Sequence, residues 1–111
     1  MQDTFLTLAE DSQGLYKEKG SRFLSFAMPV SSTEDVKAKL QVLKKNYYDA
    51  RHICYAYVLG KNGTVFRSND DGEPSGTAGK PILGQINSKD LTNVLVVVVR
   101  YFGGILLGTG G

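Results

Sequence analysis

Six consecutive apolar residues, Val94-Leu-Val-Val-Val-Val99, constrain the fold of this chain more than any other stretch. Five of the six are β-branched, and such runs are typical of strands that are buried on both faces of a sheet. The run is far too short to cross a bilayer as a helix. The length of 111 residues corresponds to one domain. We therefore expect a single domain with a fully buried strand at this position.

The remaining periodicity predicts an α+β fold. Apolar residues at helical spacing predict a helix over about 33–47, with Ser31 as its N-cap and Glu34 completing a capping box. A second helix is expected over 77–86, and Pro81 is tolerated only in its first turn. We expect a two-layer sandwich: a mostly antiparallel sheet of four or five strands with both helices on one face. The expected strands are 4–9, 15–30 with a break near Lys19 and Gly20, 52–59, 64–67 and 94–99, with a turn at Asp11–Gly14.

Charge and cysteine content limit the class of protein. Thirteen basic and eleven acidic residues give a net charge of +2, which permits an RNA partner without arguing for one. The single cysteine, Cys54, excludes an intramolecular disulfide and fits a reducing compartment. The N-terminal stretch has acids where a secretory signal has a basic region followed by an apolar core. We expect a cytoplasmic protein with no membrane partner.

The stretch Arg67–Pro81 is the strongest candidate for a functional loop, because its side chains are too small or too charged to build a core. Asp70, Asp71 and Glu73 lie within four positions, so their like charges repel unless something neutralises them. One interpretation is a Mg²⁺ site, and Mg²⁺ is the only cofactor these acids suggest. The alternative, which we favour, is ion pairing with Arg67, Lys80 and Arg100 that holds the loop closed.

Two glycine-rich junctions are candidate anion sites, since a helix start presents free backbone N–H groups and a positive dipole end. At the first junction two interpretations have equal weight: Ser75, Gly76, Thr77 and Gly79 bind a phosphate, with charge from Arg67, Lys80 and Arg100, or the glycines only allow tight packing. The second, Gly103–Gly104, is more simply explained by tight packing. The P-loop pattern is absent, because Pro74 stands where its first glycine belongs.

His52 is the only histidine, and it shares a strand face with Cys54. A zinc site of the usual type is therefore not expected, because no second histidine or cysteine is available. As a general base, His52 needs Asp49 or an acid of the loop to orient it. A hydrogen-bonded histidine at a strand end is the simpler interpretation.

Three motifs carry a resemblance to a known family. Asp49–Tyr57 reads Asp-Ala-Arg-His-Ile-Cys-Tyr-Ala-Tyr, and Arg100–Gly111 reads Arg-Tyr-Phe-Gly-Gly-Ile-Leu-Leu-Gly-Thr-Gly-Gly. With the Arg67–Pro81 loop and a weaker match at Lys19–Phe23, they resemble the Impact family N-terminal domain, also called the YigZ family. The resemblance implies a ribosomal-protein-like fold similar to domain IV of elongation factor G. It also implies that the family continues into another helix and often a ferredoxin-like domain, so residues 1–111 are expected to be a domain truncated at that helix.

Three functions follow as hypotheses. The first is a translation-linked module that binds RNA, the ribosome or a translation-control protein through the Arg67–Lys80 loop, with His52 and Arg100 beside it. The second is an enzyme, a Mg²⁺-dependent hydrolase or phosphate-transfer enzyme, that uses Asp70, Asp71 and Glu73 or takes His52 as its base. The third is a structural domain without a site of its own. Fold-level analogy alone does not decide among them.

Overall fold

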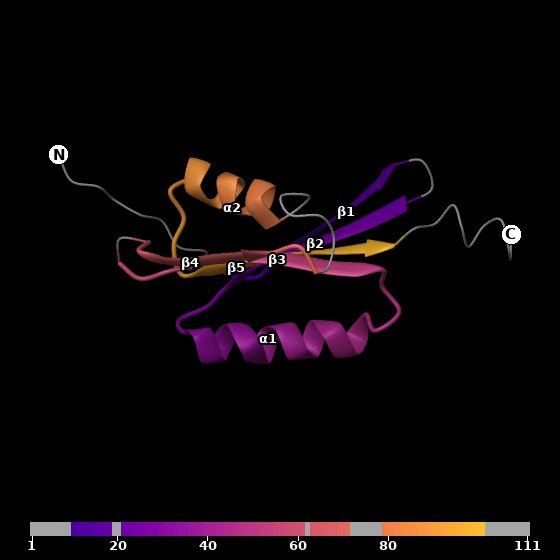
Figure 1. The fold of residues 1–111 in the computed structure, drawn as a ribbon, viewed down its shortest axis with the longest axis horizontal. Helices are drawn as coiled ribbons and strands as arrows, with labels where there is room; N and C mark the ends of the chain where they lie inside the picture. The colour runs from indigo at the N-terminus through magenta and orange to yellow at the C-terminus, as the bar shows by residue number, and fades with distance from the viewer. Residues whose placement is uncertain (1–9, 19–20, 62, 72–78, 102–111) are drawn as a thin grey trace, which may run out of the picture.

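The computed structural model describes residues 10–18, 21–61, 63–71 and 79–101. Over these residues the chain forms five strands and two helices (Figure 1). Their bounds are β1 Ser12–Glu18, β2 Ser21–Pro29, α1 Thr33–Asn46, β3 His52–Leu59, β4 Val65–Asn69, α2 Gly79–Ser88 and β5 Val94–Tyr101. Neither helix is long and apolar enough to cross a membrane, as far as the described residues extend.

The strands form one sheet in the order β1-β2-β5-β3-β4, and every neighbouring pair is antiparallel. Strand β5 is central, between β2 and β3, although it is the last strand in the described sequence. Val94, Leu95, Val97 and Val99 on this strand have no exposed surface. The prediction of a strand buried on both faces is therefore confirmed, as are the α+β class and the antiparallel sheet.

The two helices cover opposite faces of the sheet (Figure 1). Residues of β5 alternate between the two cores: Leu95 and Val97 pack with Leu40 of α1, whereas Val94 packs with Ile86 of α2. The expectation of a two-layer sandwich with both helices on one face was wrong, because the molecule has three layers. Each face of the central strands is apolar and needs its own cover.

The connections explain why this arrangement is hard to foresee. Helix α1 joins the parallel strands β2 and β3, and α2 joins the parallel strands β4 and β5 by a step in the opposite direction along the sheet. If both crossovers had the usual right hand, both helices would lie on the same face. Since they lie on opposite faces, the two crossovers have opposite hands, and one of them departs from the rule.

The N-terminal strands differ from the prediction. The stretch expected to be one interrupted strand forms two strands, β1 and β2, which pair from Ser12 opposite Ala27 to Glu18 opposite Ser21. The turn predicted at Asp11–Gly14 was wrong, because Gly14 pairs with Ser25 inside this ladder. The strand expected over residues 4–9 lies outside the described residues.

Helix α1 begins one residue later than the capping box predicted. Ser32, in an extended conformation, accepts a hydrogen bond from the Asp35 N–H at 3.1 Å. The Asp35 carboxylate in turn accepts from the Ser31 N–H at 3.0 Å, so Asp35 bonds to both serines and takes the place expected for Glu34. The motif predicted the correct turn of the chain, and the second of two adjacent serines occupies the cap.

Candidate functional site: the junction of β4, β3 and α2

The end of β4 folds back onto the start of β3 through two aspartates. Asp71 accepts a hydrogen bond from the Ile53 N–H at its Oδ2 atom, 2.6 Å away, and its carbonyl oxygen lies 3.1 Å from Nδ1 of His52. The Cys54 thiol donates to the Asp70 carbonyl at 3.5 Å. The first residues of β3 therefore make a row of contacts with the loop that follows its hairpin partner.

Asp70 ties the same loop to the second helix. Its Oδ1 atom accepts from the Gly79 N–H at 2.6 Å, at the first residue of α2. A helix start has free N–H groups and a positive dipole end, so a carboxylate is stabilised there. Asp71 has a φ of 51°, and its N–H donates to Oδ1 of Asn69 at 2.7 Å. Because of this turn, the two neighbouring carboxylates bond to different elements: Asp71 to β3 and Asp70 to α2.

Gly79 lies so close to Asn69 that no side chain fits between them. A Cβ atom added at Gly79 would meet the Asn69 backbone N at 2.8 Å and its C and O at 3.1 Å. The close approach brings the Gly79 N–H within reach of Asp70. The Gly79 N–H, which one of the two interpretations placed against a phosphate, is therefore bonded to a carboxylate of the protein itself.

Arg100 lies beside His52 on the same face of the sheet. The two residues are partners in the β3–β5 ladder, and Arg100 is also the β5 partner of Phe23 on β2. The guanidinium carbon of Arg100 lies 5.8 Å from the centre of the Phe23 ring, a cation–π arrangement. His52, Arg100 and the two aspartates thus meet at one end of the sheet, on the face that carries α2.

The predicted site residues are brought together only in part. Arg67 pairs with Tyr57, which packs in the α1 core, so Arg67 lies on the face of the sheet opposite Arg100. Lys80 is exposed in the first turn of α2. The other members of the predicted set lie outside the described residues: Glu73, Ser75, Gly76 and Thr77.

The polar side chains at this junction, His52, Asp70 and Asp71, are already hydrogen-bonded to the backbone. Because a carbonyl can only accept, the contact with Asp71 places the proton of neutral His52 on Nδ1 and leaves the basic lone pair on Nε2. Within the described part of the chain, no group of three or more His, Cys, Asp or Glu side chains is arranged to hold a metal ion. The carboxylates of Asp70 and Asp71 each bind a backbone N–H, which is a structural use of their charge.

Sequence reasoning missed Asn69, whose side chain orders Asp71 and whose backbone packs on Gly79. An asparagine directly before two aspartates at the end of a strand is a known signal for turns in which a side chain binds a nearby backbone N–H. It also missed a polar group on the opposite face, where the Tyr101 hydroxyl donates to Asp49 at 3.0 Å and the guanidinium of Arg22 lies 4.7 Å from the Tyr101 ring centre.

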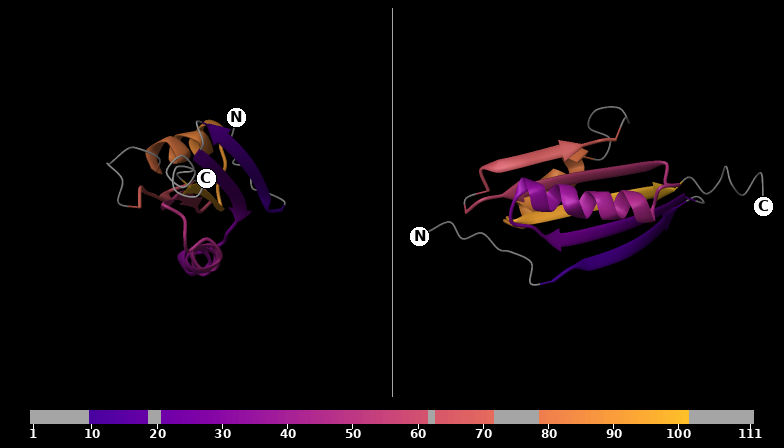
Figure 2. Two further views of the ribbon diagram at one scale, coloured as in Figure 1. Left: turned by 90° about the vertical axis from the view of Figure 1, so that its right-hand side faces the viewer. Right: turned by 90° about the horizontal axis from the view of Figure 1, so that it is seen from below.

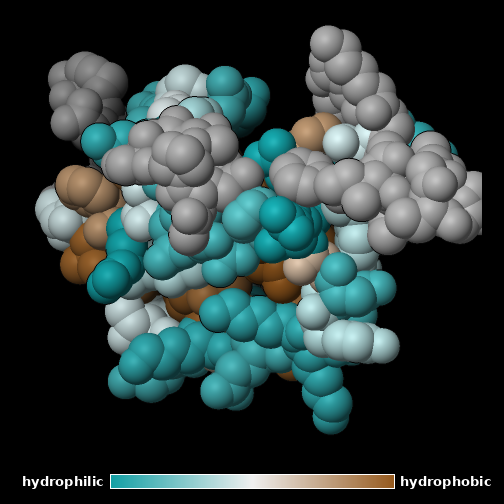
Figure 3. Space-filling view, turned by 45° about the vertical axis from the view of Figure 1, so that its right-hand side comes forward, coloured by the Kyte–Doolittle hydropathy of each residue, from teal (hydrophilic) through white to brown (hydrophobic). Residues whose placement is uncertain are grey.

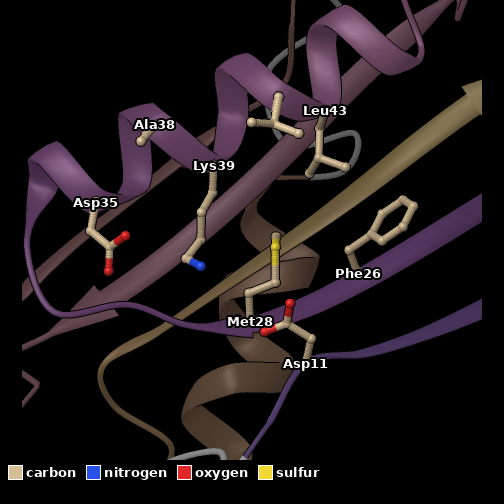
Figure 4. Close-up of a pocket in the computed structure, with 8 residues that line it drawn as sticks. Asp11, Phe26, Met28, Asp35, Ala38, Lys39 and Leu43 are labelled. Atoms are coloured by element: carbon tan, nitrogen blue, oxygen red, sulfur yellow. The ribbon is translucent and has the colours of Figure 1, made fainter.

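Two surface cavities lie away from the junction. One, of about 430 Å³, opens between α1 and β2 (Figure 4), and the other, of about 410 Å³, opens between α2 and the sheet. Phe26, Met28 and Leu43 form the apolar floor of the first, with Asp35 and Lys39 at its rim. Neither cavity is lined by His52, Asp70, Asp71 or Arg100.

Comparison with known proteins decides the family. The model of the Impact N-terminal domain matches residues 19–111. The chain belongs to the Impact family. Family relatives include YvyE of Bacillus subtilis (strain 168), 40% identical over all of this chain and 51% of its own length, and YigZ of Escherichia coli (strain K12), 44% identical over 84% of this chain and 47% of its own. The chain spans about half the length of these curated relatives.

Two solved structures resemble this Impact domain. A crystal structure described as that of a hypothetical protein is 38% identical, covers 99% of this chain and superposes with a TM-score of 0.86; this chain covers 54% of it. The structure of the two-domain translational regulator Yih1 is 31% identical over 86% of this chain and 37% of its own, with a TM-score of 0.58. The first of these confirms the fold.

Proposed function

We propose that this Impact domain is a translation-linked regulatory module that binds RNA through the Arg67–Lys80 loop and acts in the cytoplasm. Family membership and the likeness to the translational regulator Yih1 support the link to translation. The residues at the junction of β4, β3 and α2 support a binding role rather than a catalytic one. The proposal concerns the chain described here, which covers part of its relatives.

The observation that carries the proposal is the exposure of the basic side chains at the two ends of the loop, Arg67 and Lys80. The carboxylates of Asp70 and Asp71 accept backbone N–H bonds from Gly79 and Ile53, so both help to hold the junction together, although Asp71 stays exposed. The two cations are therefore the groups of the described loop residues that suit a phosphate backbone.

The test is binding of the full chain to a fluorescent single-stranded RNA of about 12 nucleotides at several salt concentrations. We expect Lys80→Gln to weaken binding and to lower the salt slope by about 0.7, the value for one lost phosphate contact on a single strand. Lys89→Gln, the same change of charge at an exposed position beyond the end of α2, is the matched control. Equal effects of the two substitutions, or no binding at low salt, would overturn the proposal.

The other hypotheses predict different results in the same assay. A Mg²⁺-dependent enzyme using Asp70, Asp71 and Glu73 should hydrolyse or transfer phosphate only with metal, and chelation should abolish the activity. RNA binding should survive chelation, because it depends on basic side chains. A purely structural domain should bind nothing, and Asp71→Asn should change its stability alone.

A further inference from the structure

Two tyrosines on β3 form an aligned pair on the face of the sheet that carries α1. The rings of Tyr55 and Tyr57 are 6.4 Å apart between centres and lie within 8° of parallel. Both side chains are half-buried, because each packs against the α1 core while part of its ring stays accessible. Their positions are therefore fixed before any ligand arrives, which lowers the entropic cost of binding.

Positive charge surrounds this pair on two sides. Arg67 is the β4 partner of Tyr57, on the same face of the sheet, and its side chain is exposed. On α1, the buried residues Val36, Leu40 and Leu43 face the sheet. On one side of these buried residues, Asp35, Lys39 and Val42 of α1 line the cavity at β2 (Figure 4).

The other flank of α1 faces β3 and β4. Residues three and four apart share a side of a helix, so Lys37, Gln41 and Lys44 form this flank. Lys37 and Lys44 are exposed. Asp35 borders the opposite cavity, whereas Glu34 lies three residues before Lys37 and shares its side of the helix, so this flank carries two lysines and one acid.

On this face of the sheet, β4 is the edge strand and α1 lies over the central strands. Seen from the α1 side, the helix runs over the middle of the sheet and β4 lies beyond it at the edge (Figure 2, right). The space-filling view shows hydrophilic residues on the outer side of α1 and hydrophobic residues in the band between the helix and the sheet (Figure 3). Because Tyr55 and Tyr57 are only half-buried, part of each side chain is accessible to a ligand on this face.

We propose that Tyr55 and Tyr57, with Lys37, Lys44 and Arg67, form a second binding surface on which successive bases of a single-stranded RNA stack. Aromatic residues on an open sheet surface bind unpaired bases in this way, and cations beside them bind the phosphates. A duplex is not a ligand of this surface, because its bases are stacked inside the helix. The inference rests on the proposed function, since it takes RNA as the ligand, but it assigns a surface on the other face of the sheet from Gly79 and Arg100.

The test compares variants of the full chain that separate the two surfaces. Tyr55→Leu/Tyr57→Leu keeps apolar side chains at both positions and removes the rings, and Phe66→Leu is the matched control. Phe66 is 61% exposed on β4 and pairs with Val58, which packs in the α2 core, so its ring lies on the other face. Removing one stacked base contact typically weakens binding about 5- to 150-fold. We expect the double variant to lose at least tenfold in affinity for the single-stranded RNA, and Phe66→Leu to lose less than twofold.

Two further readouts keep the test decisive. The chain has six tyrosines and no tryptophan, so stacked bases should quench its tyrosine emission, and the double variant should lose much of this quenching. Lys37→Gln/Lys44→Gln should lower the salt slope by about 1.4, since each phosphate contact on a single strand contributes about 0.7. Thermal melting shows whether each variant is folded at the assay temperature. If the double tyrosine variant melts below that temperature, the lysine variant and the quenching of the unaltered chain decide.

The outcomes distinguish this surface from the loop. Loss of binding in Lys80→Gln with unchanged binding in the tyrosine and lysine variants would overturn the second surface and leave the loop proposal intact. Loss in the tyrosine and lysine variants alone would support the second surface and refute the loop. Equal binding of duplex and single-stranded RNA, or binding only to a protein or a membrane, would refute the stacking surface.

Discussion

At the scale of single residues, Asp71 has two structural roles, one through its backbone and one through its carboxylate. Its backbone holds a φ of 51°, a conformation that aspartate and asparagine tolerate better than most residues. Its carboxylate accepts the N–H of Ile53, a buried residue at the start of β3. A substitution at this position therefore changes both a turn and a tertiary contact.

We predict that Asp71→Ala lowers the free energy of unfolding by about 2–3 kcal/mol, since it removes a hydrogen bond to a charged group and leaves a β-carbon with no compensating contact in the left-handed region. Asp90 has a similar φ of 54° and is exposed, so Asp90→Ala measures the backbone part alone, about 1 kcal/mol. Urea denaturation of both variants checks the difference. Equal losses would mean that the bond to Ile53 contributes nothing.

The sequence indicated where this site lies but not how it is built. The density of charge at Asp70 and Asp71 was visible, and we expected those charges to meet cations or a metal. The structure adds bonds that the sequence did not indicate: Asp71 accepts the N–H of Ile53, and Asp70 accepts the N–H of Gly79. Every sequence carries such backbone groups, so no composition reveals them. Backbone donors at the start of a strand and of a helix become recognisable only once the fold has placed them.

The hydroxyl of Tyr101, in the α1 core, makes the stability of the fold depend on pH. Burial and the hydrogen bond to Asp49 raise the pKa of Tyr101 above its usual value of 10.0. The folded state therefore holds this proton more tightly than the unfolded chain does. The resulting stability is fully present below pH 10 and is lost as the pH rises through the pKa of the folded state.

We predict that Tyr101→Phe costs about 1 kcal/mol at pH 7, where the hydrogen bond to Asp49 is intact. Above pH 10 the difference between the two proteins should shrink, because only the unaltered chain has a phenol at position 101, and the raised pKa of that phenol makes its ionisation favour unfolding. Urea denaturation at pH 7, 9 and 10.5 follows this difference. A difference that stays constant over this range would contradict the assigned pKa shift.

At the scale of elements, α2 contains two glycines with opposite roles. Gly79 touches the Asn69 backbone, whereas a Cβ atom at Gly84 would meet no atom within 4 Å. We predict that Gly79→Ala costs about 1–3 kcal/mol by overpacking and weakens the Asp70 contact. Gly84→Ala should stabilise the chain by about 0.5–1 kcal/mol, because alanine favours a helix interior. Thermal melting of the two variants should show shifts of opposite sign.

The cap of α1 provides a second matched pair. Ser32→Ala removes the hydroxyl that accepts the Asp35 N–H, so we expect a loss of about 1 kcal/mol. Ser31 contributes its backbone N–H to Asp35, which alanine keeps, so Ser31→Ala should stay within about 0.5 kcal/mol of the unaltered chain. Denaturant unfolding checks both variants. A larger loss in Ser31→Ala than in Ser32→Ala would mean that Ser31 is the N-cap, as the sequence predicted.

The elements that sequence predicted well are those with strong periodicity. Helix α1 and strands β3 and β5 fall within two residues of expectation, because their apolar positions repeat over two or more turns or pleats. Strands β1 and β2 were predicted as one interrupted strand, because apolar residues continue on both sides of Lys19 and Gly20. These two residues are too short a signal to mark a hairpin turn. The order of strands in the sheet depends on long-range pairing and leaves no local signal.

At the scale of the whole molecule, the sheet separates two cores. Ile53 belongs to the α1 core and Ile86 to the α2 core. The run Val94–Val99 already signalled burial on both faces, which required a cover on each side, yet the number of helices alone did not say where they lie. Because the two crossovers have opposite hands, α2 covers the face of the sheet that α1 leaves uncovered.

We predict that Ile53→Val and Ile86→Val each cost about 0.5–1.5 kcal/mol and that the double variant loses their sum within about 0.5 kcal/mol. Ile53→Val combined with Val99→Ala should deviate from additivity, because these residues are direct partners in the β3–β5 ladder and share one core. Chemical denaturation of both cycles checks the contrast. Strong coupling across the sheet would mean that the two cores do not act separately.

The central position of β5 has a consequence for how the chain is made. Before this strand leaves the ribosome, β1–β2 and β3–β4 exist only as two hairpins with no ladder between them, because β5 supplies the pairing to both β2 and β3. Isolated hairpins are marginally stable in water. The nascent chain therefore cannot close its sheet until Val94–Tyr101 has been synthesised, and its folding is delayed to the last strand of the sheet rather than proceeding strand by strand.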